Sequence, residues 1–244
     1  MFKISDWFKL IVCTVLSSGV AVAGNFGQMN FAYWQKITIP STYYYWNMSS
    51  ASTNTVTVTG SAFNANSTNW TIECFIYTTS YANAQGILTS AYSGNSLSWY
   101  IESPSGNIVS GNWGNPSIFT GVNVTQNVEH HMAIVNSGGT LTFYLDGSSV
   151  YTTSKPSYTT PTTWNLAGWG TSGGGISGYI SNLRCTTTVV YSGSTYTVPT
   201  APLTAITGTT LLTAQSSTVI DNGPSAYTLT NSGATVVSTS TFPF

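Results

Sequence analysis

The feature that most constrains this chain is a long succession of short strand-like runs between turn residues, with almost no helical periodicity after residue 24. Polar and apolar residues alternate with a period of two in Thr55–Thr59 and in Thr140–Leu145. Asp146-Gly147 then has the composition of a tight hairpin turn, and Val150-Tyr151 begins a return strand. About a dozen such segments predict an all-β chain, with two antiparallel sheets packed face to face.

The composition indicates a folded domain whose surface carries little charge. Only 5% of the 244 residues are charged, whereas 14% are aromatic, and a disordered chain would be poor in aromatic and β-branched residues. The surface is therefore made polar by hydroxyl and amide groups, which suits sugars or packing against copies of the same chain. The five basic residues are scattered, so no basic patch exists to neutralise phosphates, and nucleic-acid binding is not expected.

The first 44 residues differ from the rest of the chain. Leu10–Ala23 is nearly all apolar or small, and Ala21-Val22-Ala23 has the form of a signal-peptidase site. Because the run is too short for a membrane span, residues 1–23 are either a cleaved signal peptide or a retained apolar arm. Membrane contact is expected only if this segment is a signal or an anchor. Residues 24–44 are a linker or assembly segment, although Tyr43–Trp46 is either a core strand or a contact surface.

Several blocks of sequence, taken in order, carry a family resemblance. Ala62–Glu73, Glu129–Gly147 and Gly178–Arg184 resemble the opening, the central hairpin and a late strand of laminin-G-like domains, which have the concanavalin-A-like lectin/glucanase fold. Pro199–Thr207 and the ending Phe242–Phe244 are similar to a subgroup common in structural proteins of marine bacteriophages. The resemblance implies an antiparallel jelly-roll sandwich over residues 45–244, preceded by an N-terminal apolar arm.

The resemblance also implies a function. We expect a non-catalytic structural protein at the surface of a virus particle, such as a capsid decoration, fibre or spike subunit. Its partners would be copies of itself or other virion proteins, with host glycans as a further ligand. The alternative is a secreted bacterial cell-surface lectin or adhesin, which the Ala21-Val22-Ala23 site favours. The expected location is thus the virion surface or the extracellular space.

Glycoside hydrolases share this fold, so the acidic residues decide whether catalysis is expected. Hydrolysis needs two carboxylates about 5–10 Å apart, and none of the six acidic residues has a partner two or four positions along a strand. We therefore expect no enzymatic activity, and the resemblance gives Glu73 and His131 structural roles. His130 and His131 point to opposite faces and cannot chelate one ion together. Asp221-Asn222 is the one candidate pair for calcium, which needs more ligands, so no metal or other cofactor is expected.

Three aromatic residues in glycine-flanked loops are candidates for carbohydrate binding: Tyr92, Trp113 and Trp169. Aromatic rings stack on the apolar faces of sugars, and glycine neighbours allow a ring to project from its loop. The alternative is that these rings close the ends of the sandwich or pack against neighbouring subunits.

The three cysteines do not have the spacing of a zinc site. Cys74 and Cys185 both lie in apolar patterns that resemble an early and a late strand of the same fold. A disulfide between them is predicted, which would leave Cys13 in the N-terminal segment. The alternative is a pair of free, buried thiols.

Overall fold

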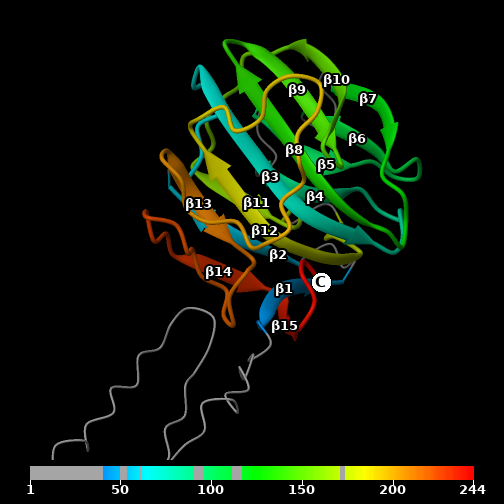
Figure 1. Cartoon of the computed structure of the whole chain (residues 1–244), viewed down its shortest axis with the longest axis vertical. Coiled ribbons are helices and arrows are strands. Elements are labelled where there is room, and N and C mark those ends of the chain that lie inside the picture. Colours follow the sequence, from blue (N-terminus) through cyan, green and yellow to red (C-terminus); the bar gives the residue numbers. More distant parts are fainter. Residues whose placement is uncertain (1–40, 50–53, 61, 91–95, 112–116, 171–173) are drawn as a thin grey trace, which may run out of the picture. The chain divides into compact units, whose positions relative to one another are not determined.

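The computed structural model describes residues 41–49, 54–60, 62–90, 96–111, 117–170 and 174–244. Fifteen β-strands and no helix occur in these ranges, and the strands form two sheets in which every pair of neighbours is antiparallel (Figure 1). The predicted all-β, two-sheet sandwich is therefore confirmed. None of the described residues forms a helix with the length and apolar character needed to cross a bilayer.

The larger sheet has eight strands in the order β10-β9-β8-β3-β12-β1-β15, with β13 paired to β12. Its strands are β1 (Tyr43–Met48), β3 (Asn69–Thr78), β8 (Glu129–Ser137), β9 (Thr140–Leu145), β10 (Ser148–Ser154), β12 (Gly178–Thr186), β13 (Thr209–Thr213) and β15 (Thr235–Thr239). The smaller sheet has seven strands in the order β14-β2-β11-β4-β5-β6-β7. These are β2 (Thr55–Thr59), β4 (Gln85–Ser90), β5 (Trp99–Ile101), β6 (Asn107–Ser110), β7 (Ile118–Asn123), β11 (Thr163–Leu166) and β14 (Leu229–Ser232).

The facing sides of the two sheets enclose the main core, and β3 shows how the sequence builds it. Side chains along a strand alternate between its two faces, so every second residue of β3 enters the core: Trp70, Ile72, Cys74 and Ile76. Phe63 packs against the rings of Trp70 and Trp164 with centroids 5.2 Å and 5.5 Å away. The alternate residues from Asn69 to Tyr77 point to the outer face of the larger sheet, and most of them are buried as well.

The outer face of the larger sheet is buried because the connection between β12 and β13 crosses it (Figure 1). We call this connection, residues 187–208, the strap. Its base is closed by a hydrogen bond of 2.9 Å from Thr187 N to Gly208 O. Further along, the strap forms a second apolar cluster with the sheet, which comprises Ala133, Val135 and Tyr144 together with Val189, Tyr191 and Tyr196. This cover explains why β3 has so few polar positions.

The N-terminal boundary of the sandwich lies earlier than the sequence predicts. The sandwich unit begins at Thr42, and β1 begins at Tyr43. Tyr43 and Tyr44 pair with β15 and therefore belong to the sheet rather than to a linker that ends at residue 44. The Tyr43–Trp46 cluster is thus a strand between β12 and β15. The predicted arm and most of the linker, residues 1–40, lie outside the described residues.

The predicted disulfide is wrong, because Cys74 and Cys185 are free, buried thiols. Cys185 lies opposite Ile72, and Cys74 lies opposite Met132 on the other neighbouring strand. The two cysteines are therefore diagonal neighbours, whose Cα atoms in antiparallel strands are about 7–8 Å apart. The Cα atoms of a disulfide are usually about 4.4–6.8 Å apart. Burial, more than any other cause, raises the pKa of both thiols above its ordinary value.

Candidate functional site

Trp169, one of the predicted sugar-binding residues, does not project from its loop. Its ring packs edge-to-face on Tyr100 with centroids 4.9 Å apart, and Val109 completes a small cluster on the outer face of the smaller sheet. Only 3% of the Trp169 surface is exposed. Gly86 of β4 explains this position, since a Cβ there would lie 2.5 Å from the carbonyl oxygen of Gly168, the residue before Trp169. Gly86 thus lets the loop lie close to the sheet, and the buried Trp169 ring cannot stack on a sugar.

The other two candidates, Tyr92 and Trp113, lie outside the described residues, but the strand ends that flank them are defined. Tyr92 lies in the β4–β5 connection and Trp113 in the β6–β7 connection. Gly111 N donates a hydrogen bond of 2.8 Å to Ser98 O, and Trp99 lies opposite Ser110. The stems of the two loops are therefore neighbours at one end of the smaller sheet, which we call the loop end.

The loop that carries Trp169 leaves from the opposite end of the same sheet. Trp164 of β11 lies opposite Ser90, and Leu166 lies opposite Leu88. The chain after β11 therefore runs away from the loop end. The structure thus brings together the stems of two of the three predicted aromatic loops and separates the third.

Hydroxyl groups line the base of the loop end. Ser90 and Ser96 are joined by a hydrogen bond between their hydroxyls, and Ser110 Oγ lies 3.4 Å from Tyr158 Oη. Ser98 is fully buried, and its Oγ has no hydrogen-bond partner among the described residues. None of these side chains is ionised at neutral pH. The charge beside them is that of Lys155, whose Nζ lies 5.4 Å from the centroid of the Tyr158 ring.

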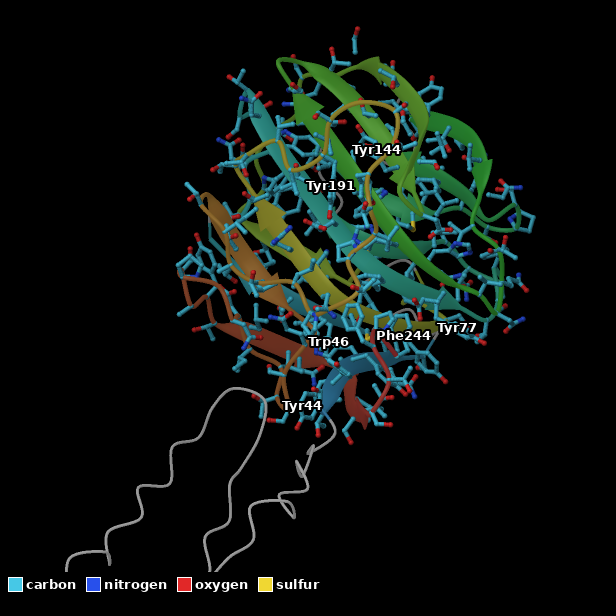
Figure 2. The ribbon with its side chains drawn as sticks, viewed as in Figure 1. Tyr44, Trp46, Tyr77, Tyr144, Tyr191 and Phe244 are labelled. Carbon is cyan, nitrogen blue, oxygen red and sulfur yellow. The ribbon has the colours of Figure 1, made fainter. Side chains whose placement is uncertain are left out.

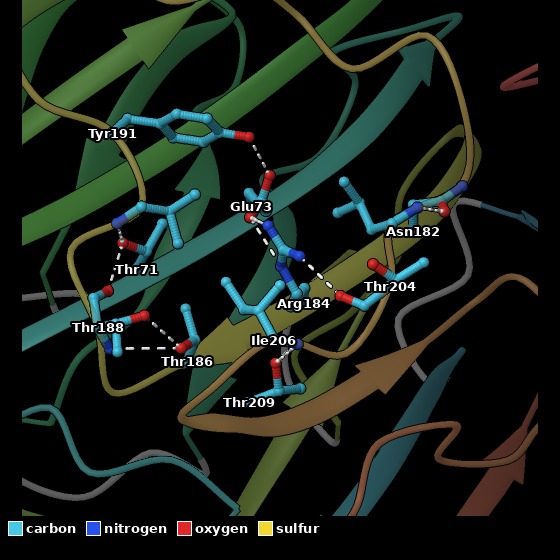
Figure 3. Close-up of polar contacts among 12 residues, drawn as sticks. Thr71, Glu73, Asn182, Arg184, Thr186, Thr188, Tyr191, Thr204, Ile206 and Thr209 are labelled. Carbon is cyan, nitrogen blue, oxygen red and sulfur yellow. Dashed lines mark hydrogen bonds and ion pairs between the residues drawn. The ribbon is translucent and has the colours of Figure 1, made fainter.

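A buried polar cluster lies under the strap, around Glu73 (Figure 3). Glu73 Oε1 accepts hydrogen bonds from Arg184, one of them from Nε at 2.9 Å. Glu73 Oε2 accepts one from the Tyr191 hydroxyl at 2.6 Å, and His131 Nε2 lies 3.3 Å from the same oxygen. Arg184 Nη1 also donates to Thr204 O at 2.8 Å. Glu73 thereby holds the strap directly at Tyr191 and, through Arg184, at Thr204.

The electrostatics of this cluster favour an ionised, paired carboxylate. Burial raises the pKa of Glu73, but the neighbouring His131 imidazole, the Arg184 charge and the Tyr191 hydroxyl outweigh it and hold that pKa below its ordinary value. Burial, followed by the Glu73 charge, raises the pKa of both Tyr191 and Tyr196. A general acid in glycoside hydrolysis needs a raised pKa and access to substrate. The pKa of Glu73 is lowered instead, and its side chain is fully buried, so a substrate cannot reach it.

The two histidines point to opposite faces and make separate contacts. His130 Nδ1 lies 2.7 Å from Asp146 Oδ2 at the hairpin turn, whereas His131 faces Glu73. His131 N also donates to Asp146 Oδ1 at 2.9 Å, so Asp146 fixes the hairpin through both oxygens. Among the described residues, no group of three or more His, Cys, Asp or Glu side chains is placed to hold a metal ion.

Asp221, the candidate calcium ligand, closes the connection between β13 and β14. Its Oδ1 accepts hydrogen bonds from Leu212 N at 3.0 Å and Gly223 N at 2.8 Å, and its Oδ2 accepts one from Tyr227 N at 3.0 Å. Both carboxylate oxygens are thus engaged by the backbone. The arrangement is that of a turn held together by one carboxylate.

An aromatic cluster lies on the outer face of the larger sheet, near β15, where the C-terminal tail returns (Figure 2). Phe244 is surrounded by the rings of Tyr45, Tyr77 and Tyr179, with centroids 5.5 Å, 6.5 Å and 5.9 Å away. We call these three tyrosines the cradle. Their rings and Phe244 are half-buried. The resemblance of the Phe242–Phe244 ending gave no indication of this contact.

Comparisons with known proteins agree with the fold. The profile of the family described as "Concanavalin A-like lectin/glucanases superfamily" matches residues 50–192. Among solved structures, a Bacteroides ovatus protein with a provisional description as carbohydrate binding is 14% identical, with a TM-score of 0.57. The match covers 80% of this chain and 59% of that protein, so the chain spans less than two thirds of the relative's length. At this identity the likeness concerns the fold alone.

Two further structures are similar at lower TM-scores. A heptameric SAP-like pentraxin from Limulus polyphemus is 15% identical with a TM-score of 0.43, over 64% of this chain and 80% of that one. Domains LG4-5 of the mouse laminin alpha1 chain are 14% identical with a TM-score of 0.45, over 67% of this chain and 48% of that one. No curated protein sequence matches the chain.

Proposed function

The chain belongs to the concanavalin A-like lectin/glucanase superfamily, and we propose that it is a non-catalytic surface protein of a virus particle that binds host glycans at its loop end. The observation that carries the glycan part is the adjacency of the two loop stems, defined by the hydrogen bond from Gly111 N to Ser98 O. It supports a site in which Tyr92 and Trp113 act together.

The chemistry of the loop end suits a neutral sugar. Aromatic rings supply apolar contact with a polar tip for hydrogen bonding, and Tyr92 and Trp113 occupy two loops whose stems are neighbours. The side chains described at the base of these loops carry hydroxyls. One cation lies beside them, since Lys155 Nζ is 5.4 Å from the centroid of the Tyr158 ring. Because the hydroxyls outnumber this single charge, a neutral glycan is the expected class.

The absence of catalysis is part of the proposal and rests on Glu73. Glycoside hydrolases of this fold need one carboxylic acid with a raised pKa and a second carboxylate across the sugar. Glu73 is buried under the strap, is paired with Arg184, and has a pKa below its ordinary value. Release of reducing ends from a polysaccharide panel, abolished by Glu73→Gln, would contradict this part of the proposal.

The virion setting is supported by the bacteriophage resemblance of the tail and by the low charge of the chain, only 5% of residues. A secreted lectin or adhesin remains the second candidate because of Ala21-Val22-Ala23. Mass spectrometry of the native N-terminus separates the two. A mature start at Gly24 favours secretion, and an intact Met1 favours a retained assembly arm.

The glycan part is tested by affinity measurements on the full-length protein with a neutral glycan selected from an array. Trp113→Ala and Tyr92→Ala are each expected to weaken binding about tenfold, the equivalent of about 1.4 kcal/mol. The matched control is Ile220→Ala, because Ile220 is an exposed apolar residue in the β13–β14 connection, 46% exposed. Wild-type affinity in both loop variants, with unchanged thermal stability, would refute the assignment.

A further inference from the structure

The turn between β14 and β15 carries the chain from one sheet to the other and places an edge of each sheet on one flank of the sandwich. β14 is an edge strand of the smaller sheet and β15 is an edge strand of the larger sheet, and only two residues separate them (Figure 1). Asn231 holds this turn, since its Oδ1 accepts hydrogen bonds from Gly233 N and Ala234 N. We call this surface the β14/β15 flank.

In the part of the chain that the structure describes, the β14/β15 flank has none of the usual protection against strand pairing. Exposed edges are normally guarded by charged residues, proline, a bulge or a covering loop. Residues 229–239 contain no charged residue and no proline, and neither β14 nor β15 shows a register shift against its neighbour. Among the hydrogen bonds of the described residues, none pairs the backbone of another segment with the outer edge of β15.

The edges on the opposite flank are protected, which makes the contrast informative. β10 is the other edge of the larger sheet, and the strap pairs with its first residues through a hydrogen bond of 2.8 Å from Ser149 N to Ser194 O. Lys155 and Pro156 follow β10 directly. β7 is the other edge of the smaller sheet; it contains Gly121 with a φ of 73° and a register shift against β6.

The surface beside β15 adds an uncharged aromatic area. Tyr45 of the cradle lies opposite Val237 of β15, and Tyr43 lies opposite Thr239. The Tyr43 ring contacts Phe242 of the tail with centroids 5.5 Å apart. No hydrogen bond is recorded for the hydroxyls of Tyr43 and Tyr45 among the described residues. Tyrosine-rich surfaces of low charge are typical of the centres of protein interfaces.

We propose that two copies of this chain associate through the β14/β15 flank, with β15 of one copy paired antiparallel to β15 of the other. This deepens the assembly part of the proposed function and rests on it, whereas it is independent of the glycan site. Antiparallel pairing of two identical strands is what a twofold axis produces, so the assembly closes as a dimer. The net charge of −1 adds little repulsion between copies.

The size of a stable interface indicates that more than one strand takes part. β15 has five residues and is about 17 Å long at about 3.4 Å per residue. A stable interface buries about 800 Å² on each partner, which one short edge strand does not supply. The β14 edge and the aromatic residues beside β15 are therefore part of the contact.

The proposal is tested with the full-length protein by light scattering and sedimentation across a wide concentration range. Wild type is expected to form dimers, and Ser238→Lys to weaken dimerisation at least about tenfold, because a lysine on an edge strand disfavours its pairing with another strand. Ser238 is exposed, so the substitution leaves the core intact. The matched control is Thr152→Lys, an exposed position on β10 at the protected edge, which is expected to dimerise as wild type does.

Hydrogen exchange supplies a local readout. The amides of residues 235–239 are expected to exchange more slowly as the wild-type protein becomes more concentrated. Any of three results would overturn the proposal: a monomer at every concentration, a dimer unaffected by Ser238→Lys, or equal disruption by Thr152→Lys. A monomer whose β15 amides are already protected would mean that another segment of the same chain covers the edge. Glycan affinity of Ser238→Lys, measured in parallel, separates failure of this interface from failure of the loop-end site.

Discussion

Replacement of Arg184 by methionine tests whether the Glu73 cluster fastens the strap to the sheet. Methionine keeps much of the side-chain volume but leaves a fully buried carboxylate without its cation. Removal of one partner from a buried ion pair costs about 3–5 kcal/mol of folding free energy. For a chain of this size each kcal/mol lowers Tm by about 2–4 °C, so the expected loss is about 6–20 °C. The hydrogen bond from Arg184 Nη1 to Thr204 O is lost as well.

The assay combines urea unfolding, followed by tryptophan fluorescence, with hydrogen exchange at neutral pH. If the cluster holds the strap, Arg184→Met should raise the amide exchange rates of residues 187–208 more than those of the core strands. The double variant Glu73→Gln/Arg184→Met should recover part of the loss, because it removes the stranded charge. A single variant within about 1 kcal/mol of wild type, with an unchanged exchange pattern, would refute the reasoning.

The same pair predicts the direction of acid sensitivity. The pKa of Glu73 in the folded state lies below its ordinary value of 4.5, so the unfolded chain takes up this proton first as pH falls. The ionised carboxylate therefore contributes stability that is fully present above the ordinary value and is lost as pH falls through the lower folded value. Arg184→Met should flatten this part of the stability profile. A wild-type profile that stays level through this acid range would contradict the assignment.

Three further outcomes are expected. Cys74 and Cys185 should resist thiol reagents in the native protein and both react after unfolding without reductant; an intact disulfide would contradict the structure. Asp221→Asn should cost about 1–3 kcal/mol in urea unfolding, since three backbone donors lose a charged acceptor. A chain that starts at Thr42 should have the same thermal unfolding midpoint as the full-length chain. One that starts at Tyr45 should unfold at a lower temperature, because two residue pairs between β1 and β15 are gone.

The sandwich was accessible from the sequence because its strands follow simple rules. The alternation in Thr140–Leu145 predicted β9, and Asp146-Gly147 predicted its turn. The structure confirms both, with φ values of 49° at Asp146 and 79° at Gly147. These signals are local, since strand alternation and turn chemistry depend on residues that are close in sequence.

The cluster around Glu73 was harder to predict because its members are distant in sequence. A signal did exist: Glu73 and Arg184 are single charges of opposite sign within otherwise uncharged strands. Such charges need partners, but nothing local says that β3 and β12 are neighbours. The role of Tyr191 was harder still to predict from the sequence, since the strap has no strand pattern. For Trp169, the neighbouring glycine was interpreted as freedom to project, whereas a Cβ on Gly168 would lie 2.2 Å from Asn54 O, so this glycine serves close backbone packing.

The cover on both sheets limits where this chain can bind a ligand. On the larger sheet, a sugar would have to displace the strap, which would expose Glu73 and the stacked rings of Tyr191 and Tyr196, 3.7 Å apart. On the smaller sheet, it would have to lift Trp169 from Tyr100. Each displacement costs buried area before any contact with the ligand forms. At the β14/β15 flank no described segment would have to be displaced. The stems of the loop end belong to other strands, so substitutions in one place should leave binding at the other unchanged.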